Sequence, residues 1–353
     1  MTTADRTTAV TDPGTPARRA GHRRRAGLTG RMARLRLAAL GVAGAALLSG
    51  CGLGTAGGFI PTGDLAGEVA GVDLSGSEVA VGSKNFNESV LLGKMTVLLA
   101  QAAGADVQDL TNMPGSASAR QAQVEGLVDV EWEYTGTAWL TYLGHEDPIP
   151  DPQAQWEAVR DEDAQIGLTW LPPAELDNTY AFTVRQDTAE RLGVRSLADI
   201  KDLPEQEQTF CVDAEFASRN DGFRPLLAAY GLGDLPDSRV RIMDIGAVYQ
   251  AVANGECTFG EAYATDGRIA ALDLAVLEDP LPFFPSYNVA PVVREEALAE
   301  DPELAVLLEA MRVRLDNETA AELNARIDVY GEEPVDVAWD WLVAEGLLTE
   351  RQD

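Results

Sequence analysis

The chain has 353 residues, of which 46% are hydrophobic and 24% charged, a balance typical of a soluble globular protein and not of a disordered one. Residues 1–50 hold nine Arg and two Asp, so 18 of the 27 basic and 55 of the 57 acidic side chains lie in the rest of the chain. That remainder, with a net charge of −37, excludes nucleic acid and anionic membrane surfaces as binding partners, because both require clustered Lys or Arg. The acidity fits solubility or a salty surrounding, and it does not exclude a cationic ligand.

The N-terminus predicts a targeting segment. An Arg-rich stretch precedes an apolar run at residues 37–48, which is too short for a transmembrane helix of about 20 residues. The run ends in Leu48-Ser49-Gly50-Cys51, which resembles the bacterial lipobox, in which the Cys is acylated and becomes the mature N-terminus. We therefore expect a lipoprotein signal peptide at residues 1–50 and an extracytoplasmic protein that only the lipid on Cys51 anchors to the cell membrane. A plain signal peptide is the alternative, and export by the general or the twin-arginine route stays open.

Beyond the signal peptide, residues 51–76 are expected to be the acylated Cys followed by a flexible tether, because residues 52–76 hold eight Gly and show no periodicity. From about Ser77, short β-like runs alternate with amphipathic stretches, which is typical of an α/β protein on a mainly parallel sheet. The length favours two lobes or one large domain.

The pattern predicts the following elements in chain order. Strands are expected at residues 78–82, 128–134, 180–185, 208–212, 241–244 and 275–278. Helices are expected at residues 87–103, 116–126, 304–315, 320–327 and 334–347, the first with Asn87 as its N-cap.

Cys211 and Cys257 are the two cysteines that remain after the lipobox. In an oxidising compartment an even pair favours one disulfide. Two buried free thiols are the alternative, because the sequence does not bring the two Cα atoms together.

Ligands of open α/β sheets bind beyond the C-terminal ends of the strands, so the strand-to-helix turns are the first place to look for a site. Distinctive polar and aromatic residues fall at these turns: Lys84, Tyr134, Thr137, Tyr180, Arg219, Tyr263 and Tyr287.

Six stretches around these residues suggest a family. They are Gly82-Ser83-Lys84-Asn85-Phe86, Glu133-Tyr134-Thr135-Gly136-Thr137, Asn178-Thr179-Tyr180-Ala181, Ser218-Arg219-Asn220-Asp221-Gly222, Tyr263-Ala264-Thr265-Asp266-Gly267-Arg268 and Phe284-Pro285-Ser286-Tyr287. In their order and separation, over about residues 78–348, they resemble the glycine betaine/carnitine/choline-binding proteins of osmoprotectant ABC importers. The sequence departs from the usual family sequence at residues 87–89 and 113–116, and these departures concern the ligand preference more than the fold.

The resemblance implies a type II periplasmic-binding-protein fold, with two α/β lobes joined by a two-strand hinge. It implies one lobe at residues 78–181 plus 290–353 and the other at residues 182–289. Its functional residues would be an aromatic cage for a trimethylammonium head (Tyr134, Tyr180, Tyr263, Tyr287) and a carboxylate-binding end (Lys84, Thr137, Arg219). The protein would be a monomer without cofactor that delivers glycine betaine, carnitine, choline or proline betaine to an ABC permease and its ATPase.

The chemistry of these residues is consistent with that assignment. A quaternary ammonium has no N–H to donate and a diffuse charge, so the negative faces of aromatic rings suit it better than carboxylate pairing. A carboxylate at the other end of the ligand calls for the charge-assisted donors that Arg and Lys supply.

The remaining candidates have structural interpretations. We expect Tyr142, Tyr230, Tyr249 and Tyr330 to pack in the core or at the surface. Packing is also expected for Trp132 and Trp139, with lining of the cleft as the alternative. Asp266 is expected to orient a turn or to pair with a basic neighbour.

An enzyme is not expected. After the signal peptide the only His is His145, in a polar stretch that predicts a surface loop. The sequence contains no G-x-S-x-G, P-loop, H-E-x-x-H or C-x-x-C motif, and no metal site is expected. Two alternatives stay open: a binding protein of the same fold for another small amine or amino acid, and a surface lipoprotein without a transport role.

Overall fold

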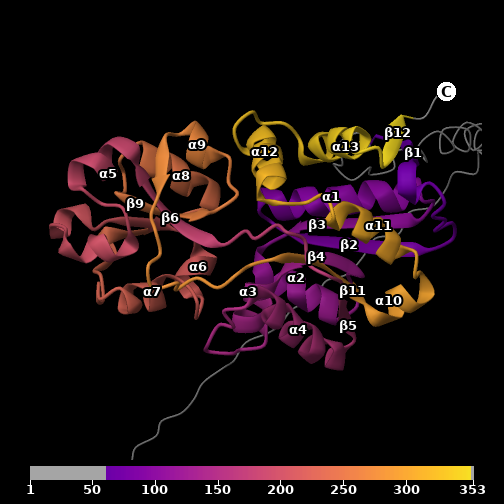
Figure 1. Cartoon of the computed structure of the whole chain (residues 1–353), viewed down its shortest axis with the longest axis horizontal. Coiled ribbons are helices and arrows are strands. Elements are labelled where there is room, and N and C mark those ends of the chain that lie inside the picture. The colour runs from indigo at the N-terminus through magenta and orange to yellow at the C-terminus, as the bar shows by residue number, and fades with distance from the viewer. Residues whose placement is uncertain (1–60, 351–353) are drawn as a thin grey trace, which may run out of the picture. The chain divides into compact units, whose positions relative to one another are not determined.

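The structure, a computed structural model, describes residues 61–350, so the expected signal peptide and the lipidation candidate Cys51 lie outside the described residues. The described chain forms two lobes, each built on a five-stranded sheet with helices on its faces (Figure 1). This confirms the expected two-lobed α/β class. Among these residues, no helix is long and apolar enough to cross a membrane.

The sheet of the first lobe combines segments from both halves of the chain. In spatial order its strands are β3 (Asp106–Met113), β2 (Glu78–Lys84), β4 (Val130–Tyr134), β11 (Val289–Arg294) and β5 (Leu168–Trp170). β2 runs parallel to β3 and β4, whereas β11 is antiparallel to β4 and β5. The return of β11 fixes the C-terminal part of the chain to this lobe.

Helices cover both faces of this sheet. α1 (Asn87–Ala102) is its central helix, and 12 of its 16 residues are buried because it lies between the sheet and the C-terminal helices (Figure 1). On the side of α1 lie α11 (Leu304–Arg312), α12 (Asn317–Asp328) and α13 (Pro334–Ala344). The other helices are α2 (Gly115–Val124), α3 (Thr135–Thr137), η3 (Ala138–Tyr142), α4 (Pro152–Asp163), η4 (Ala164–Ile166) and α10 (Glu295–Glu300).

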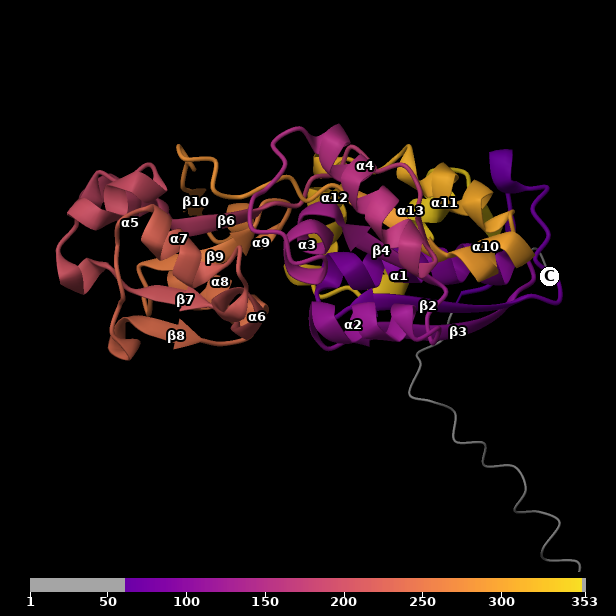
Figure 2. The same ribbon diagram turned by 90° about the horizontal axis from the view of Figure 1, so that it is seen from below.

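The second lobe is made of one continuous segment (Figure 2). Its strands in spatial order are β10 (Leu274–Val276), β6 (Tyr180–Arg185), β9 (Phe259–Tyr263), β7 (Phe210–Val212) and β8 (Val240–Ile242). Its helices are α5 (Gln186–Leu192), η5 (Leu197–Asp202), η6 (Glu205–Glu207), α6 (Ala214–Ser218), α7 (Phe223–Ala229), η7 (Asp237–Arg239), α8 (Ile245–Ala253) and α9 (Arg268–Ala271). Cys211 on β7 and Cys257 before β9 form a disulfide with their Cα atoms 5.8 Å apart, which confirms the predicted pairing.

Two extended segments connect the lobes. Asp177 forms an antiparallel bridge with Asn288, and the backbone N–H of Asn178 donates a hydrogen bond to the Tyr287 carbonyl. This pair of segments is the expected two-strand hinge. β6 begins in the second sheet at Tyr180 and β11 in the first sheet at Val289, so both crossings lie slightly before the expected boundaries at residues 181 and 290.

The segment before β2 corrects one expectation. β1 (Gly63–Leu65) pairs antiparallel with β12 (Leu348–Glu350), and η2 (Gly67–Val69) follows it. Val69 and Leu74 are buried in the main core. The expected tether through residue 76 is therefore too long, because these apolar side chains hold residues 63–74 on the first lobe despite their many glycines.

Candidate functional site

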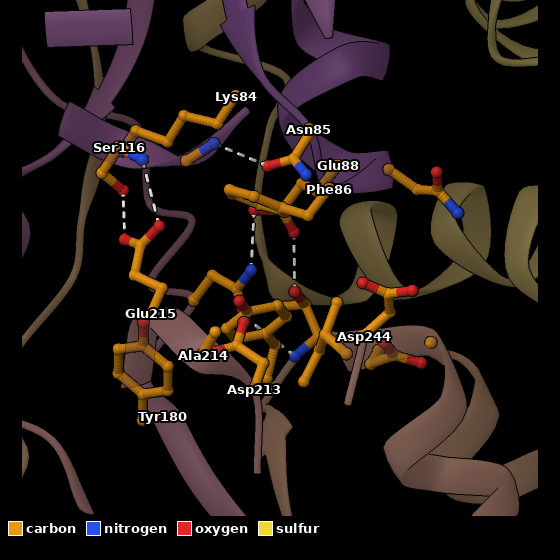
Figure 3. Close-up of a pocket in the computed structure, with 18 of the residues that line it drawn as sticks. Lys84, Asn85, Phe86, Glu88, Ser116, Tyr180, Asp213, Ala214, Glu215 and Asp244 are labelled. Atoms are coloured by element: carbon orange, nitrogen blue, oxygen red, sulfur yellow. Dashed lines mark hydrogen bonds between the residues drawn. The ribbon is translucent and has the colours of Figure 1, made fainter. Parts of the chain in front are cut away.

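A cavity of about 810 Å³ lies between the two lobes (Figure 3). Its walls include the C-terminal ends of β2, β4, β7, β8 and β9, which is where open α/β sheets bind their ligands. The structure brings together all seven residues that the sequence singled out for ligand binding: Lys84, Tyr134, Thr137, Tyr180, Arg219, Tyr263 and Tyr287.

Five rings form a continuous aromatic wall, in the order Tyr134, Phe86, Tyr263, Tyr180 and Tyr287. The centroids of neighbouring rings are 5.6, 5.3, 5.4 and 5.3 Å apart along this order. Phe86, which joins Tyr134 to Tyr263, was not predicted as a wall residue although it lies in the first motif. The wall therefore combines rings from both lobes and the hinge.

The glycine of the second motif explains how the last ring fits. A Cβ atom at Gly136 would lie 2.7 Å from the Tyr287 ring and 2.8 Å from the Ser286 carbonyl oxygen. Only glycine allows this close approach of the turn after β4 to the returning hinge strand. Gly136 thus sets the position of Tyr287 without contacting the cavity itself.

The tyrosine hydroxyls of the wall are neutral donors. Burial raises the pKa of Tyr134, Tyr180, Tyr263 and Tyr287 well above the usual value, so none of them adds a negative charge near pH 7. The Tyr134 hydroxyl donates to Glu88 at 2.9 Å, and the Tyr287 hydroxyl donates to Asp221 at 2.7 Å. These bonds fix the orientation of the two rings.

Lys84, at the end of β2, is buried and already paired. Its ammonium group contacts the Glu133 carboxylate, and its Nζ atom lies 4.6 Å from the centroid of the Tyr134 ring. Glu133 also accepts a hydrogen bond from the Tyr142 hydroxyl at 2.8 Å. Since an ammonium group has three donors, Lys84 keeps capacity for a further acceptor.

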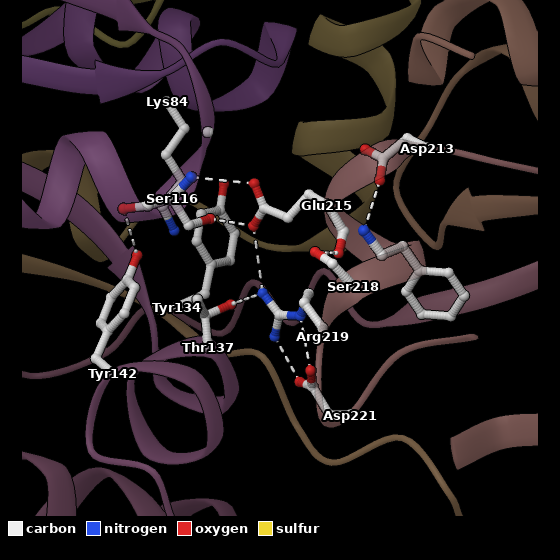
Figure 4. Close-up of polar contacts among 12 residues, drawn as sticks. Lys84, Ser116, Tyr134, Thr137, Tyr142, Asp213, Glu215, Ser218, Arg219 and Asp221 are labelled. Atoms are coloured by element: carbon white, nitrogen blue, oxygen red, sulfur yellow. Dashed lines mark hydrogen bonds and ion pairs between the residues drawn. The ribbon is translucent and has the colours of Figure 1, made fainter. Parts of the chain in front are cut away.

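Arg219, after α6, is also paired. Its Nε and Nη2 atoms donate to the Asp221 carboxylate at 2.7 and 2.5 Å, a bidentate geometry (Figure 4). Within residues 61–350, its Nη1 atom makes two long contacts of 3.4 Å, to Thr137 Oγ1 and to Glu215 Oε1. Nη1 is therefore the guanidinium atom best placed to exchange its partners for a ligand.

Glu215 holds the two lobes together beside this group. Its carboxylate accepts a hydrogen bond of 3.0 Å from the Ser116 backbone N–H, near the start of α2, and a second from the Ser116 hydroxyl (Figures 3 and 4). An anion is favourable at this position because the first turn of a helix exposes unpaired N–H groups. These contacts lower the pKa of Glu215 although burial opposes them.

A buried acid lies behind Lys84 and Glu133. Glu131 is 1% exposed, and neither of its carboxyl oxygens has a hydrogen-bond partner within the described chain. Burial, followed by repulsion from Glu133, raises the pKa of Glu131 to about 8, against the opposing charges of Lys84 and Arg120. Glu131 is therefore protonated at neutral pH.

Sequence reasoning missed one carboxylate entirely. Glu88, in the first turn of α1, is 4% exposed and lines the cavity. Four donors from separate segments hold its two oxygens: Tyr134, Asn178, Thr265 and Asn324, at 2.9, 2.9, 2.6 and 3.0 Å. The sequence signals it only indirectly, through its place beside the first motif and within residues 87–89, which depart from the family's usual sequence.

The structural interpretations of the other candidates hold. Trp132 is 1% exposed in the core and donates to Thr96, and Trp139 stacks on the His145 ring at 3.5 Å, away from the cavity. The Asp266 carboxylate accepts hydrogen bonds from the backbone N–H and from the Nε atom of Arg268, as expected for a residue that orients a turn. Neither tryptophan is among the residues lining the cavity.

Comparison with known proteins identifies the family. The family model described as the substrate binding domain of the ABC-type glycine betaine transport system matches residues 77–344. The chain belongs to this family. The resemblance seen in the six motifs is thereby confirmed.

This binding protein has relatives that it covers almost fully. It is 39% identical over 280 residues to the glycine-betaine-binding protein of Pseudomonas aeruginosa, a match that covers 77% of this chain and 89% of the relative. It is 34% identical over 278 residues to the glycine betaine-binding protein YehZ of Escherichia coli, a match that covers 76% of this chain and 91% of the relative. A solved structure of a glycine betaine/carnitine/choline ABC transporter matches with a TM-score of 0.62 and 28% identity. The match covers 75% of this chain and 98% of the solved one. The fold is that of the type II periplasmic binding proteins, and the matched family consists of substrate-binding proteins of transporters.

Proposed function

We propose that this protein captures a small quaternary-ammonium compound such as glycine betaine or carnitine outside the cytoplasm and delivers it to an ABC permease and its ATPase. The observation that carries the proposal is the aromatic wall of Phe86, Tyr134, Tyr180, Tyr263 and Tyr287 along one inter-lobe cavity. Each ring contributes about 0.5–2 kcal/mol to a desolvated cation, so five rings supply about 2.5–10 kcal/mol, a range that includes the roughly −8 kcal/mol of micromolar binding.

The charges around the cavity support a ligand with a positive group. Six acidic side chains line the cavity against three basic ones: Glu88, Asp213, Glu215, Asp244, Asp266 and Asp328 against Lys84, Arg219 and Arg268. This excess of negative charge favours a cation over an anion.

A zwitterion fits best because donors for a carboxylate are also at hand. Arg219 Nη1, Thr137 Oγ1 and the remaining Lys84 donors are our candidates for binding the ligand's carboxylate. A neutral hydroxyl in its place would leave these cations without an added partner, so we expect the protein to prefer betaine to choline by at least about tenfold, or 1.4 kcal/mol.

Isothermal titration of the purified protein with glycine betaine, carnitine, choline, proline and putrescine tests the ligand class. We expect the trimethylammonium compounds to bind, betaine and carnitine more tightly than choline, and proline and putrescine weakly. Binding of putrescine or proline alone would replace the proposal with the alternative of another amine or amino acid. Choline binding equal to betaine binding would show that the carboxylate end is misassigned.

We further propose that a lipid on Cys51 anchors the protein, which acts as a monomer. The tetrapeptide at residues 48–51 supports the anchor. Replacing Cys51 with Ser should move the protein from the membrane fraction to the soluble fraction without changing its betaine affinity. Light scattering of that soluble variant should give the mass of one chain.

A further inference from the structure

Glu88 stands apart from the other buried acids around the site. Three other buried carboxylates in this region have cationic partners: Glu133 pairs with Lys84, Asp221 with Arg219 and Asp266 with Arg268. Two buried acids without such a partner, Glu131 and Glu261, have pKa values that burial raises, which favours their neutral form. Within residues 61–350, no Lys, Arg or His nitrogen lies within ion-pair distance of Glu88, although Glu88 is only 4% exposed. A buried charge of this kind is costly unless hydrogen bonds and a counter-ion compensate it.

The hydrogen bonds to Glu88 are complete, so the missing component is the counter-ion. Two donors reach each oxygen: Tyr134 and Asn178 contact Oε1, while Thr265 and Asn324 contact Oε2. All four are neutral donors, which stabilise the ionised form without cancelling its charge. The set is built to hold a negative charge in place.

That charge is held next to the aromatic wall. Glu88 follows Phe86 by two residues, accepts the hydrogen bond of the Tyr134 hydroxyl and lines the same cavity as both rings (Figure 3). A trimethylammonium group against these rings would enter a low-dielectric region, where an opposite fixed charge attracts it more strongly than in water. The phenol that donates to an anion also becomes a more electron-rich ring for the same cation.

We propose that Glu88 is a specificity-determining residue of the binding site: its fixed carboxylate is the counter-charge for the ligand's ammonium group and selects a cationic head over a neutral one of the same shape. The inference rests on the proposed function. Thr265 belongs to the second lobe, so the full donor set forms when the lobes meet, which couples the counter-charge to the closed site.

The test compares glycine betaine with 3,3-dimethylbutanoate, its carbon isostere, which has the same shape and carboxylate but no positive charge. Affinities of the full-length protein are measured by titration calorimetry. The wild type should prefer betaine strongly. The variant Glu88→Gln should reduce that preference at least tenfold, while its affinity for the isostere changes by less than threefold.

Three further variants separate charge from structure. Glu88→Asp keeps the charge and should retain most of the preference. Thr265→Val removes one donor and should weaken both ligands alike, leaving the preference unchanged. Glu309→Gln, a matched change on α11 where Glu309 pairs with Arg312, should have no effect.

An unchanged preference in Glu88→Gln overturns the inference, whether or not both affinities fall. If Glu88→Gln does not fold, the variant Asn324→Lys tests the inference instead. It places an ammonium group beside the Glu88 carboxylate, on a cavity-lining residue that already contacts Glu88. That variant should lower the preference at least tenfold, and a preference equal to the wild type would sink the idea. If the wild type binds no trimethylammonium compound, the proposed function itself fails.

Discussion

The aromatic wall and the charged end of the cavity, where Lys84 and Arg219 lie, differ in the contacts that their residues already make within the protein. The rings lie against one another, at centroid distances of 5.3–5.6 Å, and the face of a ring needs no charged partner within the protein. Lys84 and Arg219, in contrast, are already bound to Glu133 and Asp221. An aromatic site can therefore be inferred from residue types alone, whereas the availability of a charged residue depends on its neighbours in the fold.

Removing one partner of the buried Arg219–Asp221 ion pair should have the largest effect on stability. Arg219→Ala leaves Asp221, which is 5% exposed, without its bidentate partner, so we expect the free energy of unfolding to fall by about 3–5 kcal/mol. The measurement is urea denaturation of the ligand-free protein. Adding Asp221→Asn to the variant should recover part of the loss.

The control is an exposed pair of the same type. Arg185→Ala removes the partner of Asp187, and both side chains are at least 40% exposed, so its cost should stay below about 1 kcal/mol. Equal losses at the two sites would mean that the charged end is not held by its buried pairs.

The disulfide tests whether the wall and the charged end share one scaffold. Cys211 lies on β7, which leads into α6 and Arg219, and its partner Cys257 precedes β9, which ends at Tyr263. Replacing both cysteines with Ser opens a loop with a sequence separation of 46 and should cost about 2–4 kcal/mol of unfolding free energy.

The ratio of betaine to choline affinity should stay the same in this double variant, because both sides of the cavity loosen together. A changed ratio would show that the bridge supports one side alone. Adding a reductant to the wild type should reproduce the loss of stability.

Removing a ring tests the wall directly. Tyr180 contacts both Tyr263 and Tyr287, so Tyr180→Ala should lower the affinity for betaine and for choline about 30-fold each, or 2 kcal/mol. Tyr180→Phe keeps the ring and should stay within threefold of the wild type. Tyr330→Ala, at a position that is 75% exposed, is the matched control and should change nothing. Selective loss of betaine binding alone would assign Tyr180 to the carboxylate end.

The same contrast explains what the sequence could predict. The six motifs located all seven candidates, because each motif is a short run of neighbouring residues that the sequence shows directly. The pairing of Lys84 with Glu133 joins positions 49 residues apart, and no local pattern contains it. Glu88 was missed for the same reason, since three of its four donors follow it by 90 residues or more.

Three strands of the first sheet, β3, β5 and β11, were not predicted, and two of them violate the usual signals. β3 is an edge strand of mixed polar residues in which no side chain is fully buried. β11 contains Pro291, which normally argues against a central strand. Here β5 pairs only with Val292, Val293 and Arg294, so Pro291 lies beyond its end and needs no donor on that side.

The smallest expected effect concerns Glu131, behind the charged end. Its pKa in the folded protein is about 8, raised by burial and by Glu133 from an ordinary value near 4.5. Between these two pH values the folded state binds one proton more than the unfolded state. The stability that this proton contributes is complete below about pH 4.5 and is lost as the pH rises through about 8.

Glu131→Gln has no proton to lose, so its stability relative to the wild type should increase by about 1 kcal/mol between pH 7 and pH 8. Urea denaturation at pH 6, 7, 8 and 9 measures the free energy of unfolding of both proteins. If the two free energies change with pH in parallel, Glu131 is ionised in the folded state. Lys84 is then shared between the carboxylates of Glu131 and Glu133.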